Sequence, residues 1–484
     1  MNRRFSCVFV ILLGSVAGLA QQSKPLSCSE VSSWLIGGVS SKRLSAITKQ
    51  RGISFIPVPG FLKALKTAGA EPVLLDGLRA AQPLEVSKET SCSPDLTHAA
   101  ELSFQKHYDQ VQRILRDLIK DSPNDAALHF ALGYVLQQDQ QWEDALDEFS
   151  ESARLTPGFP ETHNRLALVF YHSQDNDNAL AEARTALSID PANAEAYRLL
   201  GLAISASGRF DAAVHAFRES LERDPDNAET YYNLGITLHQ QADLAGAVLA
   251  YKKALQLRPD YWEAHSNLGL VLHDQNKLDE AIAEYKVAKR LAPKESAVRS
   301  NLGSTYCEKN DFDAALAEYR ELFRMDPEWH SGHSCVAKAL MAKHEYQGAI
   351  SELRLAVENN PTGAVEHRVL GQALLLTHDN AAALRELRIA VSLGPDSALA
   401  HHYLAMALEN GNDYAAAIKE YQEAVRVQPT ADNHYYLAVC LIKADEYDQA
   451  LAELETAARL DPGQSLYRAR KDEVLKLMRS GDIR

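Results

Sequence analysis

The sequence predicts an all-α protein built as an α-solenoid, a stack of about ten helical hairpins. Two observations lead to this prediction. Between successive prolines of a regular series, the apolar residues follow a helical period that breaks once near the middle. The prolines lie 34 residues apart at Pro123, Pro157, Pro191, Pro225, Pro259, Pro293, Pro327, Pro361, Pro395 and Pro429, and a last one follows at Pro462. One hairpin cannot bury its own apolar face, so stacked copies are needed to form a continuous core.

The hairpin from Pro259 to Ala292 shows the pattern within one repeat. Apolar and small residues at helical spacing predict a first helix over about 262–275. The polar pair Asn276–Lys277 interrupts the pattern. Acidic residues such as Asp279 then open a second helix, where they complement the positive end of the helix dipole. The next proline ends that helix because proline has no N–H to continue the hydrogen-bond ladder.

Small residues recur where the two helices of a hairpin must approach each other closely. The first helix carries Gly133, Ala167, Gly201, Gly235, Gly269, Gly303, Ala337, Gly371, Ala405 and Ala438 at one repeat position. Twelve residues later the second helix carries Ala145, Ala179, Ala213, Ala247, Ala281, Ala315, Ala349, Ala383, Ala417 and Ala450. A large side chain at either position would push the helices apart and destabilise their packing.

This order of a small residue, an alanine, an aromatic residue and a proline resembles the tetratricopeptide repeat over residues 123–461. The aromatic residue is Phe149, Phe217, Tyr251, Tyr285, Tyr319 or Tyr421. The resemblance implies a right-handed superhelix of stacked helix pairs, with the first helices lining a concave groove. Two features depart from it. Histidine replaces the usual Trp or Tyr early in the first helix of most repeats, and Ala183 replaces the aromatic residue of the second repeat.

The segments on either side of the repeats differ from them. Residues 462–484 predict one more charged helix, a cap with a polar outer face. Residues 92–122 predict a degenerate leading repeat, in which Leu115 and Leu118 fall in phase with the later second helices. Residues 21–91 form a small basic helical module, which we call the head.

The head differs from the repeats in charge and in rhythm. It holds nine Lys or Arg and five Asp or Glu, whereas residues 92–484 hold 39 basic and 60 acidic side chains. Four short helices separated by Gly and Pro are predicted within it. The string GGVSSKRLSAITKQRGISF resembles a small helical segment of exported bacterial repeat proteins, which implies no activity. The basic charge would suit docking on the acidic repeats or on an envelope surface, or it is simply solvated.

Residues 1–20 predict a secretory signal peptide. Arg3 and Arg4 precede an apolar stretch, and Gly18-Leu19-Ala20 has the small residues of a cleavage site. We therefore expect an exported protein, periplasmic or secreted, with no transmembrane segment after cleavage. The alternative is an inner-membrane anchor formed by residues 5–20, although these 16 residues are fewer than the ~20 that span a bilayer.

Cleavage at this site would leave five cysteines, namely Cys28, Cys92, Cys307, Cys335 and Cys440. In an oxidising compartment Cys28 and Cys92 could form a disulfide across the head, or both could remain buried thiols. Because five is an odd number, at least one thiol is expected to stay free. No CxxC motif occurs, and nothing indicates a structural zinc site.

No pattern in the sequence indicates catalysis, and we expect neither an enzyme nor a cofactor. GxSxG, P-loop, HExxH and GxGxxG motifs are absent. One repeat position is occupied by His129, His163, His265, His333, His367, His401 and His434. Equivalent residues of stacked helices lie ~8–10 Å apart, too far to share a metal, so we expect these rings to pack between helices. We also expect no metal at His330, His333 and Cys335, because no fourth ligand is evident.

The resemblance places one position of each first helix on the concave groove. Three successive repeats carry Asn233, Asn267 and Asn301 there. Their amides could bond both the C=O and the N–H of an extended partner backbone, or they only fix local structure. The predicted partner-binding set is completed by Arg165, Arg198, Arg368, Tyr403, Tyr435 and Tyr436. The tyrosines are either interface anchors or packing between repeats.

These features predict a non-catalytic scaffold of the bacterial cell envelope or exterior, which binds extended segments of other proteins in its groove. The net charge of −15 argues against nucleic acid or an anionic membrane as the main partner, since either would repel the chain. The alternative function is an enzyme or accessory subunit of envelope polysaccharide or glycosyl transfer with a cryptic metal site.

Overall fold

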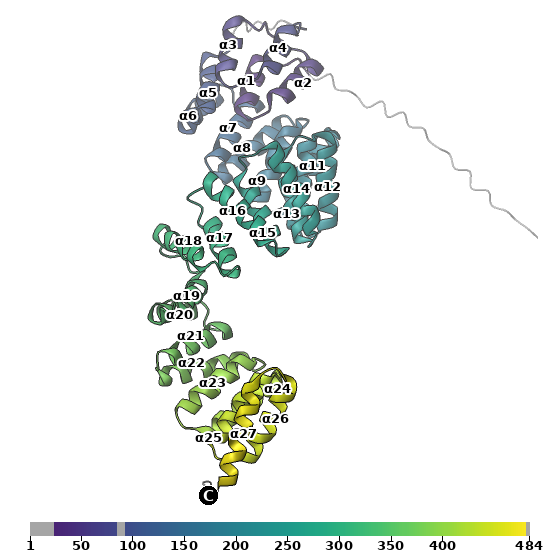
Figure 1. The fold of residues 1–484 in the computed structure, drawn as a ribbon. Helices are drawn as coiled ribbons and strands as arrows, with labels where there is room; N and C mark the ends of the chain where they lie inside the picture. The colour runs from purple at the N-terminus through teal and green to yellow at the C-terminus, as the bar shows by residue number, and fades with distance from the viewer. Residues whose placement is uncertain (1–23, 85–91, 481–484) are drawn as a thin grey trace, which may run out of the picture. The chain divides into compact units, whose positions relative to one another are not determined.

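The computed structural model describes residues 24–84 and 92–480. These residues form 27 α-helices and no strand, and their only β-bridges are two isolated ones, Leu26 with Ile53 and Ile53 with Pro83. Internal contacts divide the chain into two units, residues 1–246 and 247–484, each of which is described by itself (Figure 1). The predicted signal peptide lies outside the described residues, and none of the described helices is long and apolar enough to cross a membrane.

Unit 1 starts with four short helices of the head, and hairpins follow. The head helices are α1 (Cys28–Ile36), α2 (Ser41–Arg51), α3 (Pro59–Thr67) and α4 (Pro72–Ala80). The hairpin helices are α5 (Pro94–Phe104), α6 (Tyr108–Asp121), α7 (Ala126–Gln138), α8 (Trp142–Leu155), α9 (Pro160–His172), α10 (Asn176–Ile189), α11 (Ala194–Ala206), α12 (Phe210–Arg223) and α13 (Ala228–Gln240). The boundary between the units falls within α14 (Leu244–Leu257).

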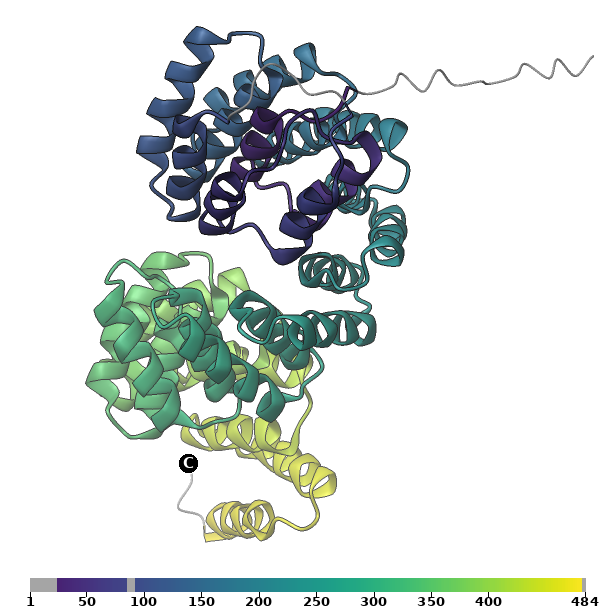
Figure 2. The ribbon, with the colours of Figure 1, turned by 90° about the horizontal axis from the view of Figure 1, so that it is seen from above.

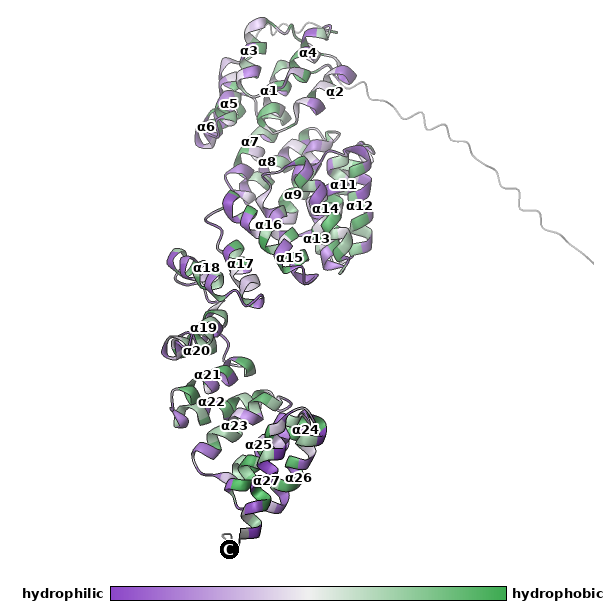
Figure 3. Cartoon of the chain, viewed as in Figure 1, coloured by the Kyte–Doolittle hydropathy of each residue, from purple (hydrophilic) through white to green (hydrophobic). Residues whose placement is uncertain are grey.

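Unit 2 continues the hairpins and ends with a single helix. Its helices after α14 are α15 (Trp262–Asp274), α16 (Leu278–Leu291), α17 (Ser296–Glu308), α18 (Phe312–Met325), α19 (His333–Ala342), α20 (Tyr346–Asn359), α21 (Ala364–Leu376), α22 (Asn380–Leu393), α23 (Ala398–Asn410), α24 (Tyr414–Val427), α25 (Ala431–Lys443), α26 (Tyr447–Leu460) and α27 (Ser465–Ser480). The helix α27 packs on α26, the last member of the hairpins. Hydrophobic and hydrophilic residues alternate along these helices, as expected for amphipathic hairpins (Figure 3).

Within each unit, the two helices of a hairpin contact each other, and successive hairpins contact one another, which confirms the predicted all-α solenoid. The small residues lie at the close approaches. A Cβ atom added to Gly269 would lie 2.8 Å from the ring of Tyr285, and one added to Gly133 would lie 2.9 Å from that of Phe149. Both rings are buried, so neither can move aside without disturbing the core.

Each hairpin turn contains one residue in the left-handed backbone conformation. Asn276, Asn310 and Asn412 adopt φ values of 59° to 61°, which asparagine tolerates better than most residues. The equivalent residues of other hairpins include Gln140, Gln174, Ala242, His344, His378 and Asp445. The polar turn predicted at Asn276–Lys277 therefore depends on one backbone conformation that the whole series shares.

The seven repeated histidines form a polar network that the sequence analysis did not predict. In each case Nδ1 lies 2.5–2.7 Å from a carboxylate oxygen of the glutamate 19 residues later, in the second helix of the same hairpin. The pairs are His129–Glu148, His163–Glu182, His265–Glu284, His333–Glu352, His367–Glu386, His401–Glu420 and His434–Glu453. These bonds tie the two helices of a hairpin together.

In His129 and His163 the second ring nitrogen also faces an acceptor. Nε2 of His129 lies 3.0 Å from the carbonyl oxygen of Pro123, and the equivalent distance from His163 to Pro157 is 3.1 Å. The hydrogen bond that His129 donates to the carboxylate of Glu148 raises the pKa of His129 above its ordinary value. Burial lowers the pKa of His163, but its bonds to Glu182 and Pro157 raise it overall. A ring between two acceptors donates from both nitrogens only when it is protonated.

The head and the first hairpins share a single hydrophobic core. Trp34 and Leu44 of the head belong to the same buried cluster as Leu102 and Phe130 of the hairpins. A disulfide joins Cys28, at the start of α1, to Cys92, just before α5, with their Cα atoms 5.5 Å apart. Figure 2 shows the head helices lying against the first hairpins of unit 1.

A second disulfide lies in unit 2, where the sequence analysis did not predict one. It joins Cys307 in α17 to Cys335 in α19, with the Cα atoms 6.0 Å apart. The helix α19 has only ten residues and starts at His333, later in its repeat than the other first helices. The bond therefore fastens a shortened helix to its neighbour. Cys440 is the remaining free thiol among the described residues, and it is buried.

Candidate binding groove

The head occupies part of the surface formed by the first helices α7 and α9. The turn after α1, at Gly37 and Gly38, lies directly on this surface. A Cβ atom on Gly37 would lie 2.3 Å from the ring of Phe130, and one on Gly38 would lie 2.6 Å from that of Tyr134. Gly38 also has a φ of +72°, a conformation that L side chains rarely adopt. Only glycine allows the backbone to approach so closely.

Arg165 in α9 accounts for the polar part of this contact. Its Nη2 atom lies 3.3 Å from the carbonyl oxygen of Gly37 and 3.4 Å from that of Gly38, so the guanidinium donates to the backbone of the head. The guanidinium also lies over the ring of Tyr134, 4.9 Å from its centroid. Burial lowers the pKa of Arg165 from its ordinary value. Arg165 was predicted to bind a partner, and in the structure it binds the chain's own head.

Two further contacts fix the head in place. Trp34 stacks on Phe159, which precedes α9, with ring centroids 4.2 Å apart. Arg43 in α2 forms ion pairs with Glu161 in α9 and with Asp190 after α10, the latter at 3.0 Å. Docking on the acidic repeats was one of the alternatives for the basic charge of the head, and Arg43 forms such a contact.

Beside this contact lies a polar cavity of about 600 Å³, which we call the groove cavity. Its walls include Arg43 of the head, Asn164 and Arg165 of α9, and the N-cap residues Asn193 and Asn227 of the next two first helices. The side chain of Asn164 is 7% exposed, and its Oδ1 has no hydrogen-bond partner among the described residues. The cavity thus presents a buried acceptor next to a guanidinium donor, which together match the N–H and C=O of a peptide.

The other predicted groove residues of unit 1 are less accessible. Arg198 is 4% exposed and bonds Glu195 at 2.6 Å and Glu229 at 2.9 Å. Asn233 is 8% exposed, and its Nδ2 atom has no hydrogen-bond partner among the described residues. Arg198 therefore serves the internal ion-pair network of unit 1.

In unit 2 the predicted residues lie on first helices, of which α15 contacts α17 and α21 contacts α23. Asn267 in α15 and Asn301 in α17 are half-buried and belong to adjacent first helices. Arg368 in α21 and Tyr403 in α23 are also half-buried, and Tyr436 in α25 is 40% exposed. Because Asn233 belongs to unit 1, the structure brings only two of the three asparagines together within one unit.

An aromatic cluster at α23 and α25 centres on His402, which the sequence analysis missed. Its ring lies 4.6 Å from that of Tyr436 and 5.4 Å from that of Tyr403, and burial lowers its pKa. Burial also raises the pKa of Tyr403. Tyr435 packs against Tyr467 of α27, at 5.3 Å. Its position in the sequence is a signal that could have found it. His402 is next to the predicted residue Tyr403 and occupies the repeat position of Phe130, eight repeats earlier.

Exposed aliphatic residues extend this cluster. Val365 in α21 is 61% exposed and Leu399 in α23 is 54% exposed, and they occupy the same repeat position. The helices α21 and α23 contact each other, so these side chains lie on neighbouring helices. Leu399 shares a helix face with His402 and Tyr403, three and four residues later. We call Val365, Leu399, His402, Tyr403 and Tyr436 the open face of unit 2.

Two of the three side chains considered for a metal are engaged elsewhere. Cys335 is in the disulfide with Cys307, and His333 bonds Glu352 at 2.7 Å. His330 provides its carbonyl oxygen to the amide of Asn359. The described residues contain no group of three or more side chains placed to hold a metal ion.

The sequence model of the tetratricopeptide repeat matches residues 96–160, 205–261, 240–296, 301–364, 368–433 and 404–465, which is more than half of the chain. The chain belongs to the tetratricopeptide repeat family. Members of this family are generally protein-interaction scaffolds. No curated protein matches the chain in sequence.

Several solved structures are similar to parts of the chain. YrrB, a tetratricopeptide protein with an unusual peptide-binding site, is 23% identical over 40% of this chain and 97% of its own, with a TM-score of 0.33. A tetratricopeptide protein from Parabacteroides merdae is 18% identical over 51% of this chain and 98% of its own, with a TM-score of 0.39. A chain of the Cut9–Hcn1 hetero-tetramer of the APC/C is 14% identical over 79% of this chain and 90% of its own, with a TM-score of 0.41.

Proposed function

We propose that this tetratricopeptide protein is a non-catalytic scaffold that binds extended segments of partner proteins on the faces of its first helices. The observation that carries the proposal is the contact between Arg165 and the carbonyl oxygens of Gly37 and Gly38. Here a first helix already holds a turn of backbone by its C=O groups, with aromatic rings beneath. The same surface chemistry suits a segment from another protein.

Two surfaces are available for such partners. In unit 1 the groove cavity offers Arg165 as a donor and Asn164 as a buried acceptor. In unit 2 the open face offers aliphatic and aromatic side chains, with Arg368 beside Val365 on α21, and Asn267 and Asn301 lie on the other first helices α15 and α17. Tyrosine and arginine are among the residues enriched in binding hot spots. We propose that the amides of Asn267 and Asn301 bond partner backbone and that the aromatic residues provide selectivity.

We also propose that the protein acts in the bacterial cell envelope or outside the cell. The predicted signal peptide of residues 1–20 supports this location. The two disulfides also support it, because such bonds persist in oxidising compartments and are rare in the cytosol. Cell fractionation with thiol labelling tests the location. Recovery of the chain in the cytosol with Cys28, Cys92, Cys307 and Cys335 free would contradict it.

A photo-crosslinking experiment tests the binding surface. We would place a photoreactive residue at Leu399, on the open face, and in a second protein at Leu355 in α20, which is 43% exposed on a second helix. We expect Leu399, but not Leu355, to crosslink a defined set of proteins in living cells. Substituting Asn267 and Asn301 with Ala should weaken capture. Equal crosslinking from both positions would contradict the proposal.

A further inference from the structure

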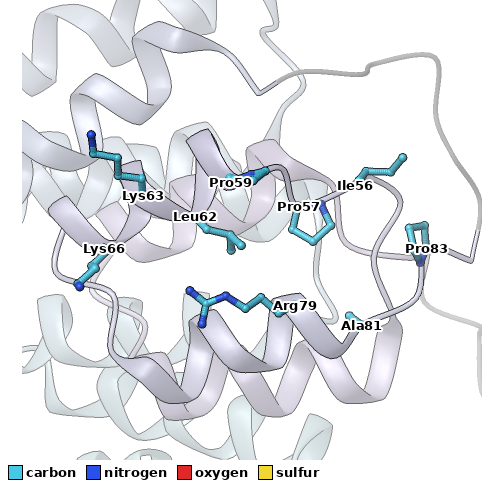
Figure 4. A pocket seen from close by; sticks show the side chains of 9 residues that line it. All are labelled: Ile56, Pro57, Pro59, Leu62, Lys63, Lys66, Arg79, Ala81 and Pro83. Atoms are coloured by element: carbon cyan, nitrogen blue, oxygen red, sulfur yellow. The ribbon is translucent and has the colours of Figure 1, made fainter.

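The head has a pocket that is separate from the groove cavity and from the open face. It lies between α3 and α4, has a volume of about 870 Å³, and is lined by head residues alone (Figure 4). We call it the head pocket. No part of the proposed function uses it, and none of the repeats contributes to it.

The floor of the head pocket is apolar. It consists of Leu62, which is 8% exposed, of Ala81, of Ile56, which is 59% exposed, and of three prolines. Proline has no backbone N–H, so this floor offers few hydrogen-bond donors. The pocket therefore suits an aliphatic side chain, which would cover the exposed surface of Ile56 and lose contact with water.

The rim of the head pocket is positive. Lys63, Lys66 and Arg79 line it, and no acidic residue does (Figure 4). Lys63 and Lys66 form no ion pair with any other described residue, while Arg79 pairs at 2.6 Å with Asp76. That pair contributes little because both side chains are more than half exposed. The rim therefore leaves positive charge available to an anionic ligand.

The start of α3 adds to this positive potential. The helix begins at Pro59, and its N-cap residue Val58 offers no side-chain acceptor to the first turn. Uncapped N–H groups at a helix start carry partial positive charge. Pro59 lines the pocket, so the helix start lies at its edge.

We propose that the head pocket binds an acidic peptide segment of a partner protein. An aliphatic side chain of this segment inserts between α3 and α4, and neighbouring Asp or Glu carboxylates pair with Lys63, Lys66 and Arg79. The concave shape favours a peptide over a lipid surface, because a flat bilayer cannot fill a cavity of this volume. It also favours a peptide over nucleic acid, because no aromatic side chain lines the pocket for a base to stack on.

A binding assay with designed peptides tests this chemistry. The probe is a short fluorescent peptide in which Glu and Leu alternate, titrated with the full chain and followed by anisotropy. Matched peptides replace Glu with Gln or Leu with Ala. We expect the Glu/Leu peptide to bind about tenfold more tightly than either matched peptide and to lose affinity as salt is raised. Equal affinity for all three peptides would overturn the proposal.

Charge reversals locate the site. We expect K66E and R79E each to weaken binding of the Glu/Leu peptide by about tenfold, since each replaces an attraction with a repulsion. K49E is the matched control, because Lys49 is exposed on α2 and does not line the pocket. The three substituted residues are exposed, so folding should be retained, and circular dichroism checks this. If K49E weakens binding as much as R79E, the peptide binds the head only through general charge and the proposal fails.

Two controls separate this proposal from its rivals. Vesicles of phosphatidylglycerol test for a membrane ligand. If the vesicles bind the chain through Lys66 and Arg79 and the peptide does not bind, the pocket faces a lipid surface. That result would overturn the proposal. The double variant Asn267→Ala, Asn301→Ala should bind the peptide normally. The proposal of peptide binding in the head pocket can therefore be wrong while the proposed scaffold function is right. The scaffold function can likewise be wrong while the head pocket binds the peptide.

Discussion

Unit 1 and unit 2 are built from the same repeat, but they use the faces of their first helices differently. In unit 1 the head covers this face at α7 and α9, whereas in unit 2 the open face is exposed. The repeat position of Glu161, which pairs with Arg43, is occupied in unit 2 by Val365 and Leu399. The position of Phe130, which packs under Gly37, is occupied by His402.

This difference shows how one scaffold can hold one segment permanently and bind another reversibly. The head is fixed by a buried indole, by an ion pair and by a disulfide, so a partner is not expected to displace it. The open face has none of these fixed contacts, and its aliphatic residues remain accessible to solvent. Each prediction below tests that contrast.

The largest effect is expected from Trp34→Ala. The indole is 3% exposed and stacks on Phe159, so its removal leaves a cavity in the core that the head shares with the hairpins. We expect unit 1 to lose about 3–5 kcal/mol of unfolding free energy, measured by urea denaturation. The control is Leu355→Ala in unit 2, where an exposed side chain is removed and a change within about 0.5 kcal/mol is expected. Equal losses in the two variants would show that the head is not docked.

The second effect concerns the two disulfides. Their sequence separations are 64 residues for Cys28–Cys92 and 28 residues for Cys307–Cys335. If each bond acts by restricting the unfolded chain, Cys28→Ser should cost about 4 kcal/mol and Cys307→Ser about 3.5 kcal/mol. Denaturation of both variants against the oxidised parent measures these losses. A larger loss for Cys307→Ser would indicate that the shortened helix α19 depends on its bond.

The third effect depends on pH and concerns His129 and His163 in unit 1. Their pKa values are raised in the folded state, so the protonated rings stabilise the fold. This stabilisation is fully present below the ordinary histidine pKa of about 6.5 and is lost as pH rises through the raised folded values. The variants Glu148→Gln and Glu182→Gln should flatten the dependence and cost about 1 kcal/mol each at low pH. A stability that increases with pH over this window would contradict the assignment.

The smallest effect on stability is expected at the open face. Leu399→Ser removes a side chain that is 54% exposed, so unfolding free energy should change by less than about 0.5 kcal/mol. Tyr436→Ala also removes the ring contact with His402 and should cost about 1 kcal/mol. Crosslinking from Val365 should nevertheless decrease, because these side chains are proposed to contact the partner. A large loss of stability would show that they belong to the core.

The repeat was predictable because its physics is local and periodic. Proline spacing, helical periodicity and the small residues at Gly269 and Ala281 each report on a contact within one hairpin. The partners of Arg165 and Arg43 were not predictable in this way. They depend on how Gly37 and Gly38, more than 120 residues away in sequence, pack on α9, and no periodic signal encodes that contact.

Two other features could have been found from the sequence. Cys307 and Cys335 lie in successive first helices, which the repeat alignment already placed side by side. Each repeated histidine has a glutamate 19 residues later, a pairing that recurs as regularly as the prolines. The histidines form a row at one repeat position, and the pairing becomes visible only when this row is compared with the second helices.

The left-handed residue in each hairpin turn has a consequence for engineering. Ala242 and His344 adopt φ values of 61° and 62°, in which a Cβ atom is strained. The same position already carries Gly208 in one hairpin, so glycine is compatible with the turn. Replacing Ala242 or His344 with Gly should therefore relieve strain worth roughly 0.5–1 kcal/mol at each site. The stability of the protein is in this way adjustable one hairpin at a time, without altering any surface proposed to bind a partner.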